Sequence, residues 1–230
     1  MTARSAVMLR PAAVAAARHM SVGGPGIAAV TALGLRLFLT PDALGAEARV
    51  AVARRLAARA PCLPFGRRGP SFADVDAARL WLADAAARIR PRLDRIGDRR
   101  EFVFTLRPAA ASNDGPVSPK AGATAASGSA YLRAAAQARA AEDRFSKAVG
   151  SIAETLRAAA PGAEIQQTRA GEGVDLSLLC GLEARPILAE AAPRLAASHA
   201  DVLKLSASGP WPPYSFASLD RESAPGEAAT

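Results

Sequence analysis

Residues 100–107 read REFVFTLR. The fold that we predict for the second half of the chain depends on this stretch. Phe102 and Phe104 alternate with Val103 and Thr105, as the two faces of a β-strand require. Outward from it, apolar spacing predicts a helix over 129–159, a hairpin with arms 163–169 and 174–182, a helix over 184–198 and a strand over 201–209. The order β-α-β-β-α-β is that of a ferredoxin-like domain, an antiparallel four-stranded sheet with two helices on one face.

The first half of the chain predicts a second small α+β domain. Residues 27–39 read as two short strands with a glycine at the turn, and a helix follows over about 45–60. The sequence CLPFG then offers a short buried strand. A three-four apolar pattern predicts a helix up to Ile96, with Ser71 as its N-cap and a kink or break at Pro91.

The whole chain is therefore predicted to be an α+β protein of two small domains, over 1–98 and 99–217. Residues 1–26 could be poorly ordered. The stretch 108–128 is dominated by Ala, Ser, Gly, Pro, Asn and Asp, which is typical of a flexible surface loop. Residues 218–230 are expected to form a disordered tail.

Composition indicates the cellular setting. The 230 residues carry 29 Lys and Arg against 21 Asp and Glu, a net charge of +8. An arginine-rich helix face over 79–100 could attract an acidic partner, although such a face is more often simply solvated. No run of about 18 apolar residues lacks a charge, so no membrane span is predicted, and Arg10 and Pro11 interrupt the apolar start before it reaches signal-peptide length. Cys62 and Cys180 stand far apart in apolar sequence, which fits reduced thiols in a cytoplasmic protein.

The segment GPWPPYSF, residues 209–216, combines prolines with aromatic rings. Prolines fix φ and lack an N–H, so neither a helix nor a central strand is expected to run through it. Trp211, Tyr214 and Phe216 supply ring surface that can anchor an irregular segment on a core. Two other interpretations stay open: Pro210 and Pro213 match a polyproline ligand, and the segment could be an ordinary strand-exit turn.

The chain resembles the gas vesicle protein L/F family (GvpL/GvpF) in four places. The terminal motif matches at Gly209, Pro210, Trp211, Pro212, Pro213, Tyr214 and Phe216. A turn motif matches at Pro64, Phe65 and Gly66, a strand opening at 100–102, and a Gly-x-x-Tyr-Leu helix start at Tyr131 and Leu132.

The resemblance implies a function in gas vesicle formation. Proteins of this family are accessory components that contact the small hydrophobic shell protein, as assembly chaperones or minor structural components. It therefore implies the shell protein and other gas vesicle accessory proteins as partners, with the gas vesicle in the cytoplasm as the location. The matched motif residues are the expected partner contacts or structural anchors.

The residues that could carry catalysis or bind a cofactor are few. His19 and His199 have no metal-ligand partners at suitable spacing, and His199 is expected at a helix end. Acidic residues such as Glu101 and Glu142 are expected to be solvated or paired with arginines. We therefore expect no enzymatic activity, no cofactor and no metal.

A different class of function stays as the alternative. A basic ferredoxin-like domain could bind nucleic acid through Phe102 and Phe104, or bind a small ligand. Against nucleic acid, the third strand of the predicted sheet, VDLSLLCGL, contains no aromatic residue.

Overall fold

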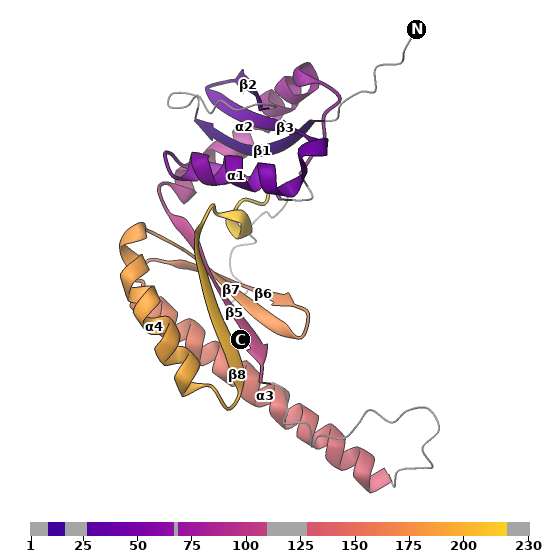
Figure 1. Ribbon diagram of the computed structural model, residues 1–230, viewed down its shortest axis with the longest axis vertical. Helices are drawn as coiled ribbons and strands as arrows, with labels where there is room; N and C mark the ends of the chain where they lie inside the picture. The colour runs from indigo at the N-terminus through magenta and orange to yellow at the C-terminus, as the bar shows by residue number, and fades with distance from the viewer. Residues whose placement is uncertain (1–8, 17–26, 67–68, 110–127, 220–230) are drawn as a thin grey trace. The chain divides into compact units, whose positions relative to one another are not determined.

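The structure is a computed structural model that describes residues 9–16, 27–66, 69–109 and 128–219 (Figure 1). Contacts divide the chain into a first unit, Met1–Glu101 with Pro210–Thr230, and a second unit, Phe102–Gly209. The expected boundaries lie after 98 and 217, whereas this division assigns the described residues 210–219 to the first unit. Most of the predicted loop 108–128 and tail 218–230 lies outside the described residues.

The first unit contains a four-stranded antiparallel sheet of order β2-β3-β1-β4. Its strands are β1 (Leu9–Ala16), β2 (Ala28–Ala32), β3 (Leu35–Pro41) and β4 (Cys62–Pro64). The hairpin of β2 and β3 and the short strand β4 confirm the prediction for these segments.

Strand β1 shows that residues 9–16, part of the segment 1–26 expected to be poorly ordered, form a sheet strand, while residues 1–8 and 17–26 lie outside the described residues. It pairs with both β3 and β4, so it occupies an inner position of the sheet. Pro11 stands next to a register shift between Pro11 and Ala13, where a proline is tolerated within a sheet. Ala12, Ala13 and Ala15 are fully buried, and their small side chains let a helix lie close to the strand.

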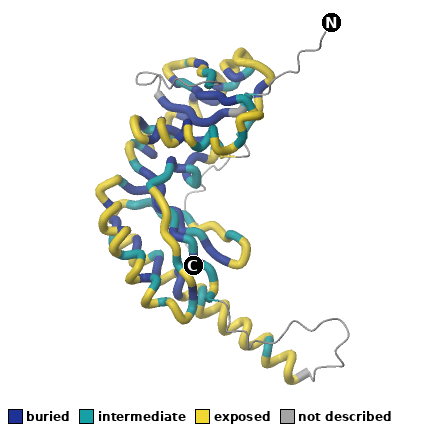
Figure 2. The backbone as a smooth tube through the Cα atoms, viewed as in Figure 1, coloured by how far each residue is buried: buried dark blue, intermediate teal, exposed yellow. Residues whose placement is uncertain are grey.

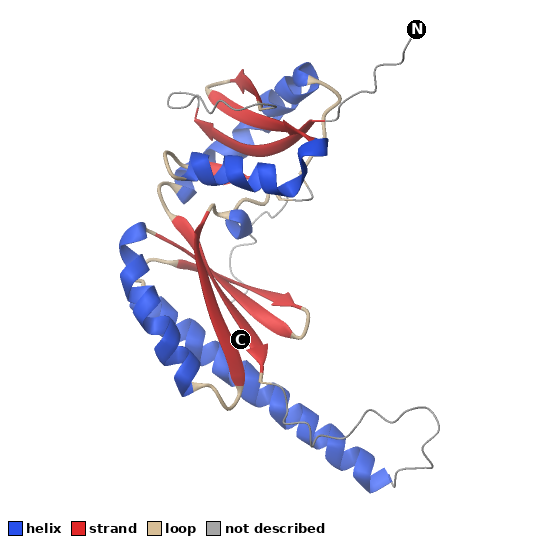
Figure 3. Cartoon of the chain, in the orientation of Figure 1, coloured by secondary structure: helices blue, strands red, loops and turns tan. Residues whose placement is uncertain are grey.

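Two helices cover the faces of this sheet (Figure 3). Helix α1 (Gly45–Ala57), which follows the short helix η2 (Asp42–Leu44), packs Val52, Ala53 and Leu56 against β1. Helix α2 (Val75–Ile96) contacts β2, β3 and β4.

Helix α2 differs from the prediction at two points. Its N-cap is Asp74, whose side chain accepts from the N–H of Ala77 at 2.7 Å, and not Ser71. Pro91 lies inside a helix that continues unbroken to Ile96. Pro91 is exposed, and buried side chains on both sides of it hold the two halves of the helix on the same sheet: Leu82, Ala86, Ile89, Leu93 and Ile96.

The second unit has the predicted ferredoxin-like topology. Its strands β5 (Arg100–Pro108), β6 (Glu164–Ala170), β7 (Gly173–Cys180) and β8 (Leu203–Trp211) form an antiparallel sheet of order β6-β7-β5-β8. Helices α3 (Gly128–Ala159) and α4 (Arg185–Ser198), the latter preceded by η3 (Leu182–Ala184), cover one face of it (Figure 1). Phe104 and Leu106 of β5 share a buried core with Ile152 and Leu156 of α3.

Strand β8 carries Pro210 within its bounds, at the edge of the sheet. An edge position leaves one row of backbone groups without sheet partners, so the missing N–H of a proline is tolerated there. After Trp211 the chain turns through the short helix η4 (Tyr214–Phe216).

The turn between β2 and β3 contains a strained residue. Leu33 has φ 48° and Gly34 has φ 75°, a left-handed pair that suits glycine or asparagine but not leucine. The Leu33 carbonyl accepts a hydrogen bond from the guanidinium of Arg90 on α2, which holds the turn in place.

Replacing Leu33 by Asn should therefore stabilise the protein. The Leu33 side chain is 60% exposed, so its loss removes little buried surface. Relief of the left-handed leucine should raise the free energy of unfolding by about 1 kcal/mol, measured by urea denaturation. Gly34→Ala is the opposing control and should destabilise. A Leu33→Asn variant less stable than the parent would contradict this account.

Candidate functional site

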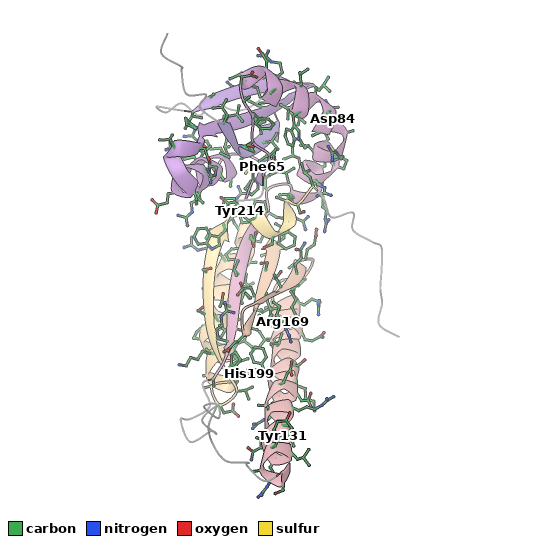
Figure 4. The ribbon with its side chains drawn as sticks, turned by 90° about the vertical axis from the view of Figure 1, so that its right-hand side faces the viewer. Phe65, Asp84, Tyr131, Arg169, His199 and Tyr214 are labelled. Carbon is green, nitrogen blue, oxygen red and sulfur yellow. The ribbon has the colours of Figure 1, made fainter. Side chains whose placement is uncertain are left out.

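The residues that the sequence singled out meet mainly in the first unit, around the segment 209–216 (Figure 4). Pro212, Pro213 and Phe216 are buried, and Trp211 and Tyr214 are half-buried. Tyr214 packs against a cluster of buried residues from β1, β3, α1 and β4. The segment after Gly209 is therefore packed as part of the first unit.

Trp211 is covered by a charged side chain from α1. The Arg54 guanidinium carbon lies 3.9 Å from the centroid of the Trp211 ring. This is a cation–π contact, worth about 1 kcal/mol where it is partly exposed to solvent. It fixes the first ring of the segment on the first unit.

Glu101 also holds the segment, through hydrogen bonds from Ser215. Its carboxylate is 2% exposed and accepts the backbone N–H of Ser215 at 2.9 Å and the Ser215 hydroxyl at 2.6 Å. The expectation that Glu101 is solvated or paired with arginine was wrong. A buried carboxylate is costly unless donors face it, and Ser215 supplies two.

The neighbouring residue, Arg100, closes the end of a helix. Its guanidinium donates to the carbonyl oxygens of Asp98 at 2.8 Å and Arg99 at 2.9 Å, and also to that of Ala57 at the end of α1. A cation at this position satisfies carbonyl groups that a helix C-terminus leaves open.

Two ionisable side chains lie within the same core. Burial raises the pKa of the Cys62 thiol from 9.0 to about 12, an effect that Arg100 partly opposes. Burial likewise raises the pKa of Tyr214 from 10.0 to about 12. Both groups are therefore uncharged at neutral pH, and Cys62 is not a reactive thiolate.

A pocket of about 440 Å³, called the aromatic pocket below, lies beside this anchored segment. Three of its walls are the rings of Phe65, Trp81 and Tyr214, and Figure 4 shows Phe65 close to Tyr214. The other described residues that line it are Pro64, Gly66, Gly69, Pro70, Arg88, Ala217, Ser218 and Leu219. The turn motif Pro64, Phe65 and Gly66 and the terminal motif, distant in the sequence, thus line the same pocket.

The remaining predicted site residues, Tyr131 and Leu132, do not join this pocket. They lie in the second unit, on α3, and are 72% and 67% exposed. Residues 129–144 of α3, called the α3 arm below, are all exposed except Ala134, which is intermediate (Figure 2).

Sequence reasoning missed several residues around the segment: Arg54, Cys62, Trp81 and the role of Glu101. No spacing signal connects them, because they come from four separate elements. His199 has the position expected of it, with Nδ1 3.1 Å from the carbonyl oxygen of Leu195 in the last turn of α4. His19 lies outside the described residues.

Within the described residues, no group of three or more His, Cys, Asp or Glu is arranged to hold a metal ion. Among the same residues, no helix has the length and apolar character needed to cross a membrane.

Removing the Ser215 hydroxyl should weaken the attachment of the segment. Ser215→Ala takes one of two donors from a buried carboxylate, so the free energy of unfolding should fall by about 1–3 kcal/mol in urea denaturation. Ser218→Ala, an exposed serine on the same segment, is the matched control and should change stability by less than about 0.5 kcal/mol. Equal stabilities of the two variants would show that the Glu101 contact contributes nothing.

Alkaline pH should destabilise the protein through Cys62 and Tyr214. Their pKa values are higher in the folded protein than the ordinary 9.0 and 10.0, so the unfolded chain loses these protons first. The stabilisation is complete below pH 9 and is lost as the pH rises toward 12. Tyr214→Phe should make the fall in unfolding free energy shallower above pH 10. A parent curve flat over this range would contradict the assignment.

Comparison with known proteins relates the fold and the sequence to gas vesicle proteins. The crystal structure of the gas vesicle protein GvpF from Anabaena sp. PCC7120 is similar, with a TM-score of 0.66 and 11% identity over 94% of this chain and 100% of that one. The crystal structure of GvpF from Microcystis aeruginosa gives a TM-score of 0.63 and 10% identity over 92% and 99% of the two chains. At these identities the likeness shows the fold, an α+β arrangement of two antiparallel four-stranded sheets with helices. A search of curated protein sequences gave no match.

The sequence comparison is more specific than the fold. The family described as "Gas vesicle synthesis protein GvpL/GvpF" matches residues 36–218, well over half of the chain. The matched range includes both the turn motif at Pro64 and the terminal motif at 209–216. The chain therefore belongs to the GvpL/GvpF family of gas vesicle synthesis proteins.

Proposed function

We propose that this protein is an accessory factor of gas vesicle formation that binds the hydrophobic shell protein, as an assembly chaperone or a minor structural component. It acts by binding and not by catalysis, in the cytoplasm and at the gas vesicle, together with other gas vesicle accessory proteins. Membership of the gas vesicle synthesis family supports the setting. The α3 arm supports the binding role.

The α3 arm is the observation that carries the proposal. Its 16 residues extend about 24 Å. Tyr131 and Leu132 near its start are largely in water, and alanine is its commonest residue. The exposure of two large apolar side chains on one turn favours a protein partner, because water is a poor solvent for such a surface.

The apolar stripe of the arm continues the buried stripe of the same helix. Val149, Ile152 and Leu156 face the core of the second unit. At three- and four-residue spacing the stripe then runs outward through Phe145, Ala141 and Ala138 toward Tyr131. A partner helix or strand with an apolar face would extend the core along this line.

A cavity at the base of the arm adds to this surface. It has a volume of about 810 Å³, and Ala138, Ala141 and Phe145 of α3 form one side of it. Val174 and Val202, from β7 and the turn before β8, lie on the other side. Its lining also includes charged residues of both signs, Glu142, Arg144, Arg169, Glu172 and Asp201, so a partner would meet apolar and charged groups together here.

Charging the α3 arm should abolish shell protein binding. Tyr131→Asp with Leu132→Asp places two carboxylates on the exposed arm, one of them on the apolar stripe, so co-purification of shell protein with the tagged variant should fall by at least about tenfold. Both side chains are mostly exposed, so the urea unfolding midpoint should stay close to that of the parent.

The control is Ile187→Asp on α4. Ile187 is 50% exposed and apolar, in the same unit but away from the arm. It should leave binding unchanged. Normal shell protein binding by the Tyr131→Asp, Leu132→Asp double variant would refute the role of the arm. Abundant intact gas vesicles in cells without the gene, and without a second family member, would refute the function.

A further inference from the structure

We infer that the aromatic pocket is a second binding site, which takes an apolar side chain that lies next to a carboxylate in a peptide segment of a partner protein. The site belongs to the first unit and uses no residue of the α3 arm. It therefore goes beyond the proposed function, and each can fail without the other.

Ring contacts and hydrogen bonds support the walls of the pocket. The Trp81 ring is held between two other rings, 5.8 Å from Phe65 in an edge-to-face arrangement and 5.6 Å from Phe72, measured between centroids. Tyr214, the third ring that lines the pocket, belongs to the short helix η4. Glu101 holds this helix by accepting a hydrogen bond from the backbone N–H of Ser215. Preformed walls of this kind bind with a small loss of side-chain entropy.

The size and composition of the pocket fit a side chain. A volume of about 440 Å³ lies at the lower end of the range for ligand pockets. Trp, Tyr and Arg are the residue types that contribute most binding energy at protein interfaces. Trp81, Tyr214 and Arg88 line this pocket together.

The charge of the lining selects an acidic ligand. Arg88 is the one charged side chain among the described lining residues. Its present partner, Asp84, lies 3.4 Å away, and the two side chains are 54% and 80% exposed. An ion pair this exposed is weak, so a carboxylate of a ligand can replace Asp84 on Arg88.

Tyr214 lines the pocket, and its hydroxyl interacts electrostatically with Cys62, Arg54 and Glu101, none of which lines it. Its pKa of about 12 keeps the hydroxyl protonated at neutral pH. Among the described residues the hydroxyl has no hydrogen-bond partner.

Gly66 lies at the edge of the pocket and provides a test variant. A Cβ atom built on Gly66 meets no atom within 4 Å, and its φ is not in the left-handed region. A larger side chain is therefore compatible with the local backbone and would reduce the space for a ligand. Gly69, in contrast, would bring a Cβ within 3.3 Å of Phe65.

Binding can be measured through Trp81. The chain has 2 Trp residues, so Trp211→Phe leaves Trp81 as the single fluorescent reporter. The probe is the peptide acetyl-Glu-Leu-Phe-Glu-amide, compared with acetyl-Lys-Leu-Phe-Lys-amide and acetyl-Glu-Gly-Gly-Glu-amide. We expect saturable quenching with the first peptide and affinities at least about tenfold lower with the other two.

The decisive variants are Arg88→Gln and Gly66→Val in the same background. Each should weaken binding of the acidic apolar peptide by about tenfold or more. The matched control is Arg79→Gln, because Arg79 lies on the same helix and forms a similar exposed pair, 2.8 Å from Asp76 with exposed fractions of 55% and 81%. It should bind like the parent, as should the Tyr131→Asp, Leu132→Asp double variant.

Three outcomes would overturn the inference. The first is unchanged peptide affinity in both Arg88→Gln and Gly66→Val. The second is equal affinity for the acidic and basic peptides. The third is binding of phenylacetate as tight as that of the peptide, which would make the pocket a site for a small organic acid.

Discussion

The buried carboxylate of Glu101 and the two donors of Ser215 connect the beginning of β5 to the end of the described chain. A charged oxygen out of contact with water is stable only when hydrogen bonds face it. Since Ser215 supplies both, the segment after β8 must return to the first unit. The division of the chain follows from this, because residues after Gly209 belong with residues before Phe102.

The prolines make this return possible. A buried irregular segment normally carries backbone N–H groups without partners. Proline has no backbone N–H, so Pro210, Pro212 and Pro213 add no such unpaired donor. The N–H groups that remain are used: Tyr214 donates to Pro212 at 2.8 Å, Phe216 to Pro213 at 3.2 Å and Ser215 to Glu101. The part of the segment after Trp211, where β8 ends, can therefore be buried without a sheet partner, and its rings then supply the apolar contact.

The two candidate surfaces differ in their physical character. The α3 arm is an exposed stripe with small and large apolar side chains, suited to a partner that extends the core of the second unit. The aromatic pocket is a walled site with one cation, suited to a single side chain and a carboxylate. The α3 arm exists because helix α3 is longer than the sheet that it covers. The aromatic pocket exists because the C-terminal segment packs in the first unit.

The sequence by itself determined the elements whose signals are local. The alternation of Phe102 and Phe104 and the spacing of the apolar residues in α3 predicted the ferredoxin-like order, because period-two and three-four patterns depend only on neighbours. The motif residues Pro64 to Gly66 and 209–216 came instead from the resemblance to the GvpL/GvpF family, and 209–216 also from its combination of prolines and aromatic rings. Strand β1 was missed because alanines carry little strand signal, and its burial depends on α1.

Only the tertiary structure decided which distant residues meet. Pro91 stays inside α2 because packing against the sheet outweighs its local cost, and Glu101 is buried because Ser215 comes to it from the end of the chain. The aromatic pocket likewise needs Phe65, Trp81 and Tyr214 from three separate segments. Contacts between residues far apart in the sequence leave no periodic pattern in the sequence. Burial and pocket geometry are therefore decided only when each unit folds.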